Sequence, residues 1–336
     1  MQYKNVIITG SGIYHPKHKM TNDHYINEYK KMGKDITDFL DKFGQKERYI
    51  IDNDHENSLT MAIEASKNAI KDAGISPEEL DAIVFSSDTP EYLCPTNALI
   101  INQKINAKNA HIVYDLNSNC TGMLVAIDQI SGYMKATKKI KYALVVGAVY
   151  ESSVADKESK YIYPLSGDGA AAVILKYTEE DTERGILDSH YCTKSEYYPK
   201  VLSPQCGLTK SRLSTASEKE KKHVWIPFPF HFLAGCWGDA IRTFEKEHNF
   251  NANDIDHFFI SQYSKQFISD IANELDLKDY ESKFTYVGDK YGYTGTTSPI
   301  FALNEARKTK IINKNDLSII CSVAAGVSLC TLLYKF

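Results

Sequence analysis

Three segments of the sequence carry side chains that could form a catalytic site. The first is Asp115-Leu-Asn-Ser-Asn-Cys120-Thr-Gly-Met123, which has the pattern of a strand, a short turn and a helix start. A cysteine at a helix start lies near the positive end of the helix dipole, which favours the thiolate and therefore nucleophilic attack. A buried structural cysteine is the alternative interpretation of Cys120, because cysteine is among the residue types most often buried.

The other two segments are rich in glycine. Ser166-Gly-Asp-Gly-Ala-Ala-Ala172 is a tight turn that leads into a strand, and it lacks the spacing of a phosphate loop or dinucleotide fingerprint. Tyr291-Gly-Tyr-Thr-Gly-Thr-Thr-Ser298 is a loop that opens a helix. We therefore predict structural turns beside a site, and we do not expect nucleotide binding.

Alternating strands and helices are predicted along the first half of the chain. Continuous apolar runs predict buried strands, and an apolar period near 3.6 residues predicts helices. This order predicts a mostly parallel sheet covered by helices, with ligands bound at the carboxyl ends of the strands. The predicted strands are residues 6–9, 81–87, 112–116, 142–148 and 170–176, and the predicted helices are residues 58–73 and 121–138.

The second half of the chain repeats the first at an offset of 175 residues. Residues 76–86 can be aligned with residues 251–261, because both have polar residues, then Leu or Ile, Asp, a four-residue strand core and Ser. The same offset relates residues 142–146 to residues 317–321, and the helix after Cys120 to the helix after Gly295.

The repeat predicts two similar α/β halves packed together. We assign residues 1–177 to the N-terminal half and residues 178–336 to the C-terminal half. The stretch of about residues 178–240, with polar runs such as residues 217–222, is predicted to form a cap around the site.

Composition limits the class of protein. The 336 residues are 43% hydrophobic and 24% charged, as in globular proteins, and the net charge of −4 provides no basic surface for nucleic acid or membrane. The 7 cysteines form no CxxC pair, so no zinc site or redox motif is expected. No signal peptide or membrane span is apparent, and a soluble cytoplasmic protein with free thiols is predicted.

Taken together, five segments resemble the ketoacyl-ACP synthase III-type condensing enzymes of the thiolase superfamily. The resemblance covers nearly the full length and implies a layered α/β/α/β/α sandwich. The segments are Phe43-Gly-Gln-Lys-Glu-Arg48, Asn119-Cys-Thr-Gly122, Gly167-Asp-Gly169, Tyr291-Gly-Tyr-Thr294 and Ala324-Ala-Gly326.

The resemblance implies a role for several residues. Cys120 would be the nucleophile that accepts an acyl group from a CoA or acyl-carrier-protein thioester, with no permanently bound cofactor. The backbone N–H groups of Cys120 and Gly326 would form the oxyanion hole. A homodimer is also implied, in which Leu93 and Cys94 would reach the acyl tunnel of the neighbouring subunit.

Two family positions are changed in this sequence. The histidine and asparagine that stabilise the enolate of a malonyl thioester align with Ser261 and Tyr293. A serine hydroxyl is nearly inert as an acid or base near pH 7, so decarboxylative condensation is expected to be slow. Asp88 follows a strand end near Cys120 and is the best candidate to replace the histidine, since an apolar pocket raises a carboxyl pKa.

Further positions are open to two interpretations. The adenine-stacking tryptophan of the family aligns with Phe39 and its arginine partner with Lys160, so these residues either bind the thioester carrier or are ordinary surface residues. His231 and His257 are additional acid/base candidates, although a wall or core position is the expected one for each.

The first functional hypothesis is an acyltransferase of secondary or lipid-like metabolism that transfers an acyl group from Cys120 to a second substrate. An alternative is a catalytically impaired subunit that supports a paralogue in a heterodimer. The third is an aldol enzyme similar to hydroxymethylglutaryl-CoA synthase, in which Asp88 would be the acid/base group.

Overall fold

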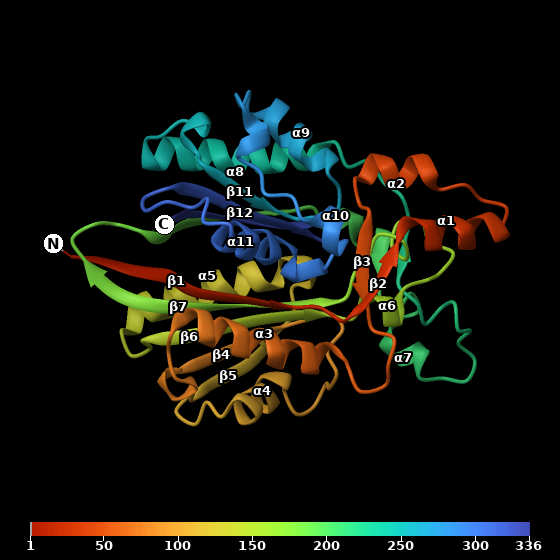
Figure 1. The fold of residues 1–336 in the computed structure, drawn as a ribbon, viewed down its shortest axis with the longest axis horizontal. Coiled ribbons are helices and arrows are strands. Elements are labelled where there is room, and N and C mark those ends of the chain that lie inside the picture. The colour runs from red at the N-terminus through yellow and green to blue at the C-terminus, as the bar shows by residue number, and fades with distance from the viewer. Residues whose placement is uncertain (1) are drawn as a thin grey trace.

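The computed structural model describes residues 2–336, all of them in one α/β structure (Figure 1). Its helices are α1 (Asn22–Lys31), α2 (Thr37–Phe43), α3 (Ser58–Ala73), α4 (Asn97–Ile105), α5 (Gly122–Thr137), α6 (Glu151–Val154), α7 (Gly207–Ser211), α8 (Phe232–His248), α9 (Gln266–Glu274), α10 (Gly288–Tyr291) and α11 (Ser298–Lys308). Its strands are β1 (Tyr3–Tyr14), β2 (His18–Thr21), β3 (Glu47–Ile50), β4 (Ala82–Ser86), β5 (Ile112–Leu116), β6 (Tyr142–Val149), β7 (Gly169–Glu180), β8 (Gly185–Thr193), β9 (Val201–Leu202), β10 (Val224–Trp225), β11 (His257–Ile260), β12 (Leu317–Ala324) and β13 (Ser328–Lys335).

The elements are stacked in five layers (Figure 1). Helices α8 and α9 form the outer layer above the strands of the second half, α5 and α11 form the middle layer, and α3 and α4 cover the strands of the first half. The predicted α/β/α/β/α sandwich is confirmed. Because α5 lies in the central layer, the residues at its N-terminus are in reach of both halves.

The strands pair in the order β11-β12-β13-β8-β1-β7-β6-β4-β5. The two halves are joined in this order only where β1 meets β8, at the register Val6↔Gly185. The prediction of a mostly parallel sheet is wrong: β7 runs antiparallel to both β1 and β6, and β13 runs antiparallel to both β12 and β8. Strand β13 follows β12 by a short turn and must reverse direction, whereas β7 follows β6 only after a longer connection that contains α6. Apolar runs alone disclose neither reversal.

The duplication predicted from the sequence is present in the structure. Strands β4 and β11 begin 175 residues apart, and so do β6 and β12. A 3₁₀ turn with a capping box precedes both β4 and β11, with Ser76 at one N-cap and Asn251 at the other. Short 3₁₀ turns at Asn119–Thr121 and Gly295–Thr297 likewise precede α5 and α11. Equivalent polar caps therefore fix equivalent elements in the two halves.

Helix α3 shows how closely the layers pack. Asn57 and Thr60 form its capping box, Gly74 ends it with a φ of 66°, and its bounds match the prediction. A Cβ on Gly12 of β1 would lie 2.4 Å from the backbone nitrogen of Ala69, so only glycine permits this strand–helix approach.

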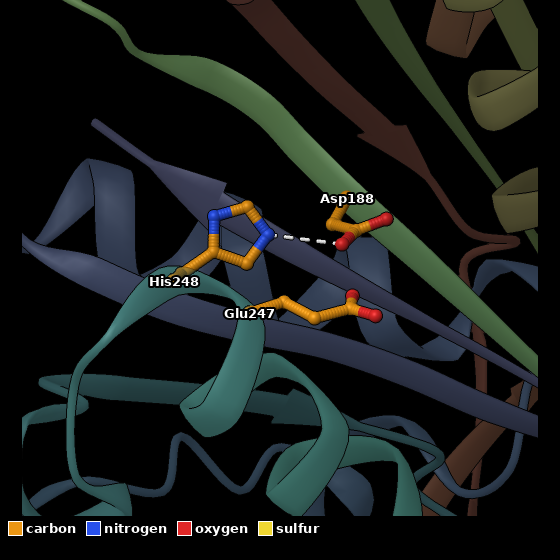
Figure 2. Close-up of side chains that lie close together, drawn as sticks. All are labelled: Asp188, Glu247 and His248. Atoms are coloured by element: carbon orange, nitrogen blue, oxygen red, sulfur yellow. Dashed lines mark hydrogen bonds and ion pairs between the residues drawn. The ribbon is translucent and has the colours of Figure 1, made fainter.

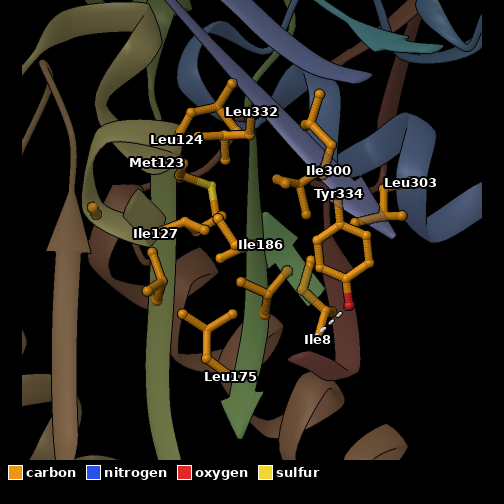
Figure 3. Close-up of a cluster of buried hydrophobic side chains, with 14 of the residues drawn as sticks. Ile8, Met123, Leu124, Ile127, Leu175, Ile186, Ile300, Leu303, Leu332 and Tyr334 are labelled. Atoms are coloured by element: carbon orange, nitrogen blue, oxygen red, sulfur yellow. Dashed lines mark hydrogen bonds between the residues drawn. The ribbon is translucent and has the colours of Figure 1, made fainter. Parts of the chain in front are cut away.

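The middle of the molecule is an apolar core to which both halves contribute (Figure 3). Tyr334 of β13 accepts a 2.8 Å hydrogen bond from the backbone N–H of Ile8, so its buried hydroxyl is satisfied. Because α5 packs in this core, the turn that precedes it is held by residues of both halves. The residues labelled in Figure 3 are Ile8, Met123, Leu124, Ile127, Leu175, Ile186, Ile300, Leu303, Leu332 and Tyr334.

The cap is shorter than predicted. Strands β7 and β8 belong to the main sheet, and α8 begins at Phe232, so the excursion comprises residues 194–231. It contains α7 and the short antiparallel pair of β9 and β10. The expected division at residue 177 falls inside β7, because that strand continues to Glu180. Over residues 2–336, no helix has the length and apolar character that a membrane crossing requires.

Candidate active site

A cavity of about 370 Å³ lies where the two halves and the cap meet, and Cys120 is part of its wall. All three segments singled out in the sequence reach it, through Cys120, Ser166 and Tyr293. Much of the remaining wall is aromatic or aliphatic, so the cavity suits an apolar chain. These apolar lining residues are Tyr161, Ile162, Tyr198, Val201, Leu202, Trp225, Phe228, Phe230, Leu233, Tyr263, Phe267, Val323 and Val327.

Cys120 lies in the 3₁₀ turn before α5, where Asn119 has a positive φ of 49°. Residues of the second half hold it in place. The hydroxyl of Ser322 donates a 2.8 Å hydrogen bond to the carbonyl oxygen of Cys120. The sulfur accepts hydrogen bonds from the backbone N–H of Ala325 and from the hydroxyl of Tyr293. The position of the thiol is therefore fixed across the interface between the halves.

The expectation that the helix dipole favours a Cys120 thiolate is wrong for the unliganded protein. The pKa of the Cys120 thiol is raised to about 12, mainly by burial and also by the nearby carboxylates of Asp88 and Glu151, while the hydrogen bonds from Tyr293 and Ala325 oppose the shift. Desolvation and neighbouring negative charges both disfavour an anion, and at Cys120 they prevail over the helix terminus. Formation of a thiolate at Cys120 would therefore require a base that takes the thiol proton.

This pKa predicts slow alkylation of Cys120. With a pKa of about 12, the reactive thiolate is on the order of one part in 10⁴ at pH 8, so the rate with iodoacetamide should rise about tenfold per pH unit between pH 7 and pH 10. Mass spectrometry of the peptide that contains Cys120 measures this rate. Asp88→Asn should accelerate the reaction, because it removes a negative charge beside the thiol. A pH-independent rate, or no effect of Asp88→Asn, would contradict the interpretation.

Ser261 lies behind the site rather than in its wall. It is fully buried, its hydroxyl lies 2.9 Å from the hydroxyl of Ser322, and it accepts a 3.2 Å hydrogen bond from the N–H of Val323. Since Ser322 in turn donates to the carbonyl of Cys120, Ser261 helps to position the Cys120 turn and does not contact the cavity. A direct catalytic role, expected from its alignment with a histidine, is not supported by this position.

Tyr293 contacts the Cys120 sulfur directly. Its backbone N–H donates to the carbonyl of Leu165 at 2.8 Å, and its own carbonyl accepts from Gly167 at 2.9 Å, so the glycine turn of the first half fixes its position. Burial, together with Cys120, raises the pKa of Tyr293 well above its ordinary value. The hydroxyl therefore stays neutral and donates one hydrogen bond toward the Cys120 sulfur.

Asp88 lines the cavity, as expected from its place after β4. The pKa of Asp88 is raised to about 6, mainly by burial and also by the Glu151 carboxylate, while His223 opposes the shift. Its Oδ1 atom is buried and has no hydrogen-bond partner within residues 2–336. A carboxyl with this pKa can both accept and release a proton near neutral pH.

Glu151 and His223 complete the polar part of the wall, and sequence reasoning missed both. Glu151 begins α6, and its carboxylate pairs with Nδ1 of His223, which the cap contributes. Burial disfavours the imidazolium, but Glu151 and Asp88 outweigh this effect and raise the pKa of His223 above its ordinary value. No local pattern in the sequence marks a pair that is separated by 72 residues.

The two histidines considered in the sequence lie elsewhere. His231 is exposed at the start of α8, and His257 of β11 pairs with Asp316 at 2.8 Å; neither is among the residues that line the cavity. Figure 2 shows a third histidine, His248, which bonds Asp188 at 2.9 Å with Glu247 beside it. This cluster lies on β8 and the end of α8, and the ion pair accounts for its arrangement.

Phe39 and Lys160 lie together, as the resemblance implies. The ammonium group of Lys160 is 4.8 Å from the centre of the Phe39 ring, in cation–π geometry. Lys160 lines a second hollow, which shares Tyr161 and Trp225 with the Cys120 cavity. Leu93 and Cys94 do not line the Cys120 cavity; Cys94 is exposed, and Leu93 is 69% exposed.

Comparisons with known proteins agree with this architecture. Residues 114–195 match the family 3-oxoacyl-[acyl-carrier-protein (ACP)] synthase III, and residues 246–336 match its C-terminal part. Residues 196–245, which include His223, lie between the two matched segments.

Named relatives cover the chain almost completely. A beta-ketoacyl-[acyl-carrier-protein] synthase III of Clostridium botulinum is 28% identical over 335 residues, 96% of each chain, and one of Aliarcobacter butzleri is 30% identical over 298 residues, 87% of each chain. The crystal structure of 3-oxoacyl-[acyl-carrier-protein] synthase III from Aquifex aeolicus superposes with a TM-score of 0.84 at 24% identity, over 99% of this chain and 100% of that one. The chain therefore belongs to the 3-oxoacyl-[acyl-carrier-protein] synthase III family and is an acyltransferase of the condensing type.

Proposed function

We propose that the protein takes an acyl group from a CoA or acyl-carrier-protein thioester onto Cys120 and transfers it to a second substrate. The position of the thiol at the wall of an apolar cavity, hydrogen-bonded to Ala325 and Tyr293, carries this proposal. Asp88 and His223 line the same cavity and are the available bases for the thiol proton.

In the loading step the Cys120 sulfur attacks the thioester carbon as its proton leaves. The carbonyl oxygen becomes an oxyanion, which the backbone N–H groups of Cys120 and Gly326 would stabilise. Gly326 lies in the cavity wall with a φ of 112°, a conformation that side chains rarely adopt, in the turn between β12 and β13. The C–S bond to the carrier then breaks, and the carrier thiolate takes the proton.

The second step is proposed to be transfer without decarboxylation of a malonyl thioester. That reaction needs donors to the developing enolate oxygen, and losing one such donor typically costs about 10²–10³ in rate. Ser261 is buried behind the turn, and Tyr293 already donates to the Cys120 sulfur. The presence of Asp88 in the cavity keeps an aldol-type addition as a second candidate.

A homodimer is proposed across the edge of the sheet. Strand β5 is the last in the strand order, and all five of its residues are half-buried. Tyr92, Leu93 and Leu99, from the loop before α4 and from α4 itself, are 47%, 69% and 51% exposed. An unpaired strand edge beside exposed apolar side chains suits a second copy of the chain.

Intact-protein mass spectrometry tests the proposal. The protein is incubated with acyl-CoA and acyl-carrier-protein thioesters of several chain lengths, and a mass increase of one acyl group on the peptide that contains Cys120 is expected. Absence of an adduct with every thioester would contradict the proposed function.

Lys160 is expected to bind the phosphates of the thioester carrier. Lys160→Ala should raise the KM for acyl-CoA about tenfold and leave kcat nearly unchanged, because one charge-assisted hydrogen bond to phosphate is lost. Lys104→Ala, on the exposed face of α4, is the matched control and should have no effect. Steady-state kinetics with acyl-CoA measures both variants, and equal KM values for the two would refute the assignment.

A further inference from the structure

The polar end of the Cys120 cavity is assembled from three separate segments. Asp88 follows β4, Glu151 begins α6 and His223 belongs to the cap. All lining residues are within the described part of the chain, and none of them is Lys or Arg. Two carboxyl groups therefore face the cavity with one imidazole and no permanent positive charge.

Backbone contacts fix the histidine in this cluster. The N–H of His223 donates a 2.8 Å hydrogen bond to the carbonyl of Val154, and His223 forms a parallel bridge with Ala155. Its Nδ1 atom pairs with the Glu151 carboxylate, which holds that proton on Nδ1. The lone pair of the neutral ring is then on Nε2, for which the residues of 2–336 provide no hydrogen-bond partner. This is the arrangement of a carboxylate-oriented general base.

Asp88 adds to the cluster a hydrogen-bond acceptor that has no donor. Its Oδ1 atom is buried, and no described residue donates to it. A buried oxygen without a donor is costly, so a ligand with N–H groups is the chemistry that would satisfy it. An ammonium group has three donors and no acceptor, and it carries the charge that two carboxylates attract. The carboxylate of a malonyl group would instead be repelled by Asp88 and Glu151.

We propose that the acyl group on Cys120 is received by a primary amine, which binds as its ammonium form at Asp88 and Glu151, loses its first proton to Asp88 and gives up its second proton to His223 as it attacks. The product would be an amide. This inference rests on the proposed function, because Cys120 must first carry an acyl group.

The reaction balances as an aminolysis. The ammonium loses one proton to the Asp88 carboxylate, from which it passes to solvent. The free amine forms a bond from nitrogen to the thioester carbon, and His223 Nε2 takes a second proton from that nitrogen. The C–S bond breaks, and the imidazolium returns this proton to the Cys120 sulfur. One ammonium and one thioester give one amide, one thiol and one released proton.

The test separates loading from transfer. Wild-type protein is acylated to completion with octanoyl-CoA, separated from CoA, and mixed with butylamine, 1-butanol or malonyl-CoA, and loss of the acyl mass from Cys120 is followed over time. We expect butylamine to discharge the enzyme at least tenfold faster than 1-butanol, with octanoyl butylamide as the product. Faster discharge by butanol or malonyl-CoA would overturn the inference and leave the proposed function intact, whereas failure to load would contradict the proposed function itself.

Variants test the base and the ammonium site. His223→Gln should slow discharge by butylamine about 100-fold, as expected for loss of a general base, and added imidazole should restore part of the rate. His231→Gln, on an exposed histidine outside the cavity, is the matched control and should behave as the wild type. Asp88→Asn should raise the butylamine concentration that gives the half-maximal discharge rate about tenfold. The corresponding concentration of 1-butanol should not change. A wild-type discharge rate in His223→Gln, or no imidazole rescue, would overturn the role of His223.

Discussion

Cys120→Ala is expected to abolish acyl transfer and the covalent adduct together. Loss of the attacking atom costs on the order of a millionfold in kcat where a nucleophile has been removed from a hydrolase site. The Ala325 and Tyr293 groups that contact the sulfur would remain, so the cavity and its affinity for thioesters should persist. Intact-protein mass spectrometry and turnover of acyl-CoA measure the two losses.

Two further measurements show whether the loss of activity in Cys120→Ala comes from the missing sulfur. Calorimetric titration of Cys120→Ala with acyl-CoA should give nearly the wild-type Kd, which separates a lost nucleophile from a collapsed cavity. Cys206→Ala removes a cap thiol that does not line the cavity, and it should load and turn over normally. Residual adduct on Cys120→Ala at the wild-type level would place the nucleophile elsewhere.

Gly167→Ala is expected to reduce the free energy of unfolding by about 3 kcal/mol, the upper range for overpacking. A Cβ on Gly167 would lie 2.2 Å from the carbonyl oxygen of Tyr291, a backbone atom that cannot rotate away. The loop that follows carries Tyr293, whose carbonyl accepts the Gly167 N–H. Relief of the clash must therefore move Tyr293 and weaken its hydrogen bond to Cys120, so the rate of acyl loading should also fall.

Urea denaturation and the rate of adduct formation measure the two effects of Gly167→Ala. Gly132→Ala is the matched control, because Gly132 is an exposed position of α5 where a Cβ meets no atom within 4 Å. It should be neutral or stabilise the protein by about 0.5–1 kcal/mol through helix propensity. Equal unfolding free energies for the two variants would show that the contact with Tyr291 does not constrain the fold.

Elements that depend on local patterns could be predicted from the sequence. The bounds of α3 follow from its capping box and terminal glycine, and the residues of β5 follow from a short apolar run. The duplication could be predicted because similar polar residues and strand cores recur 175 residues apart in the sequence. The direction of β7 could not be predicted in this way, since an apolar strand has the same composition in parallel and antiparallel pairs.

The candidate site was predictable only in part. Cys120, Asp88 and Tyr293 follow strand ends or open helices, so their meeting follows from topology. The pair of Glu151 and His223 depends on how the cap folds back onto α6, which no periodicity encodes. The raised pKa of Cys120 was likewise missed, because burial and neighbouring carboxylates are properties of the assembled cavity.

Along the chain, the cap is connected to the sandwich at the end of β8 and at the start of α8. It supplies His223 and several aromatic residues of the cavity wall. Cys120, by contrast, lies in the turn before α5, at the central layer between the strands of the two halves. Substitutions within residues 194–231 can therefore alter which molecule enters the cavity while the apolar core and Cys120 stay unchanged. Because the cap and the central layer are separate parts of the chain, the same fold can accommodate different second substrates.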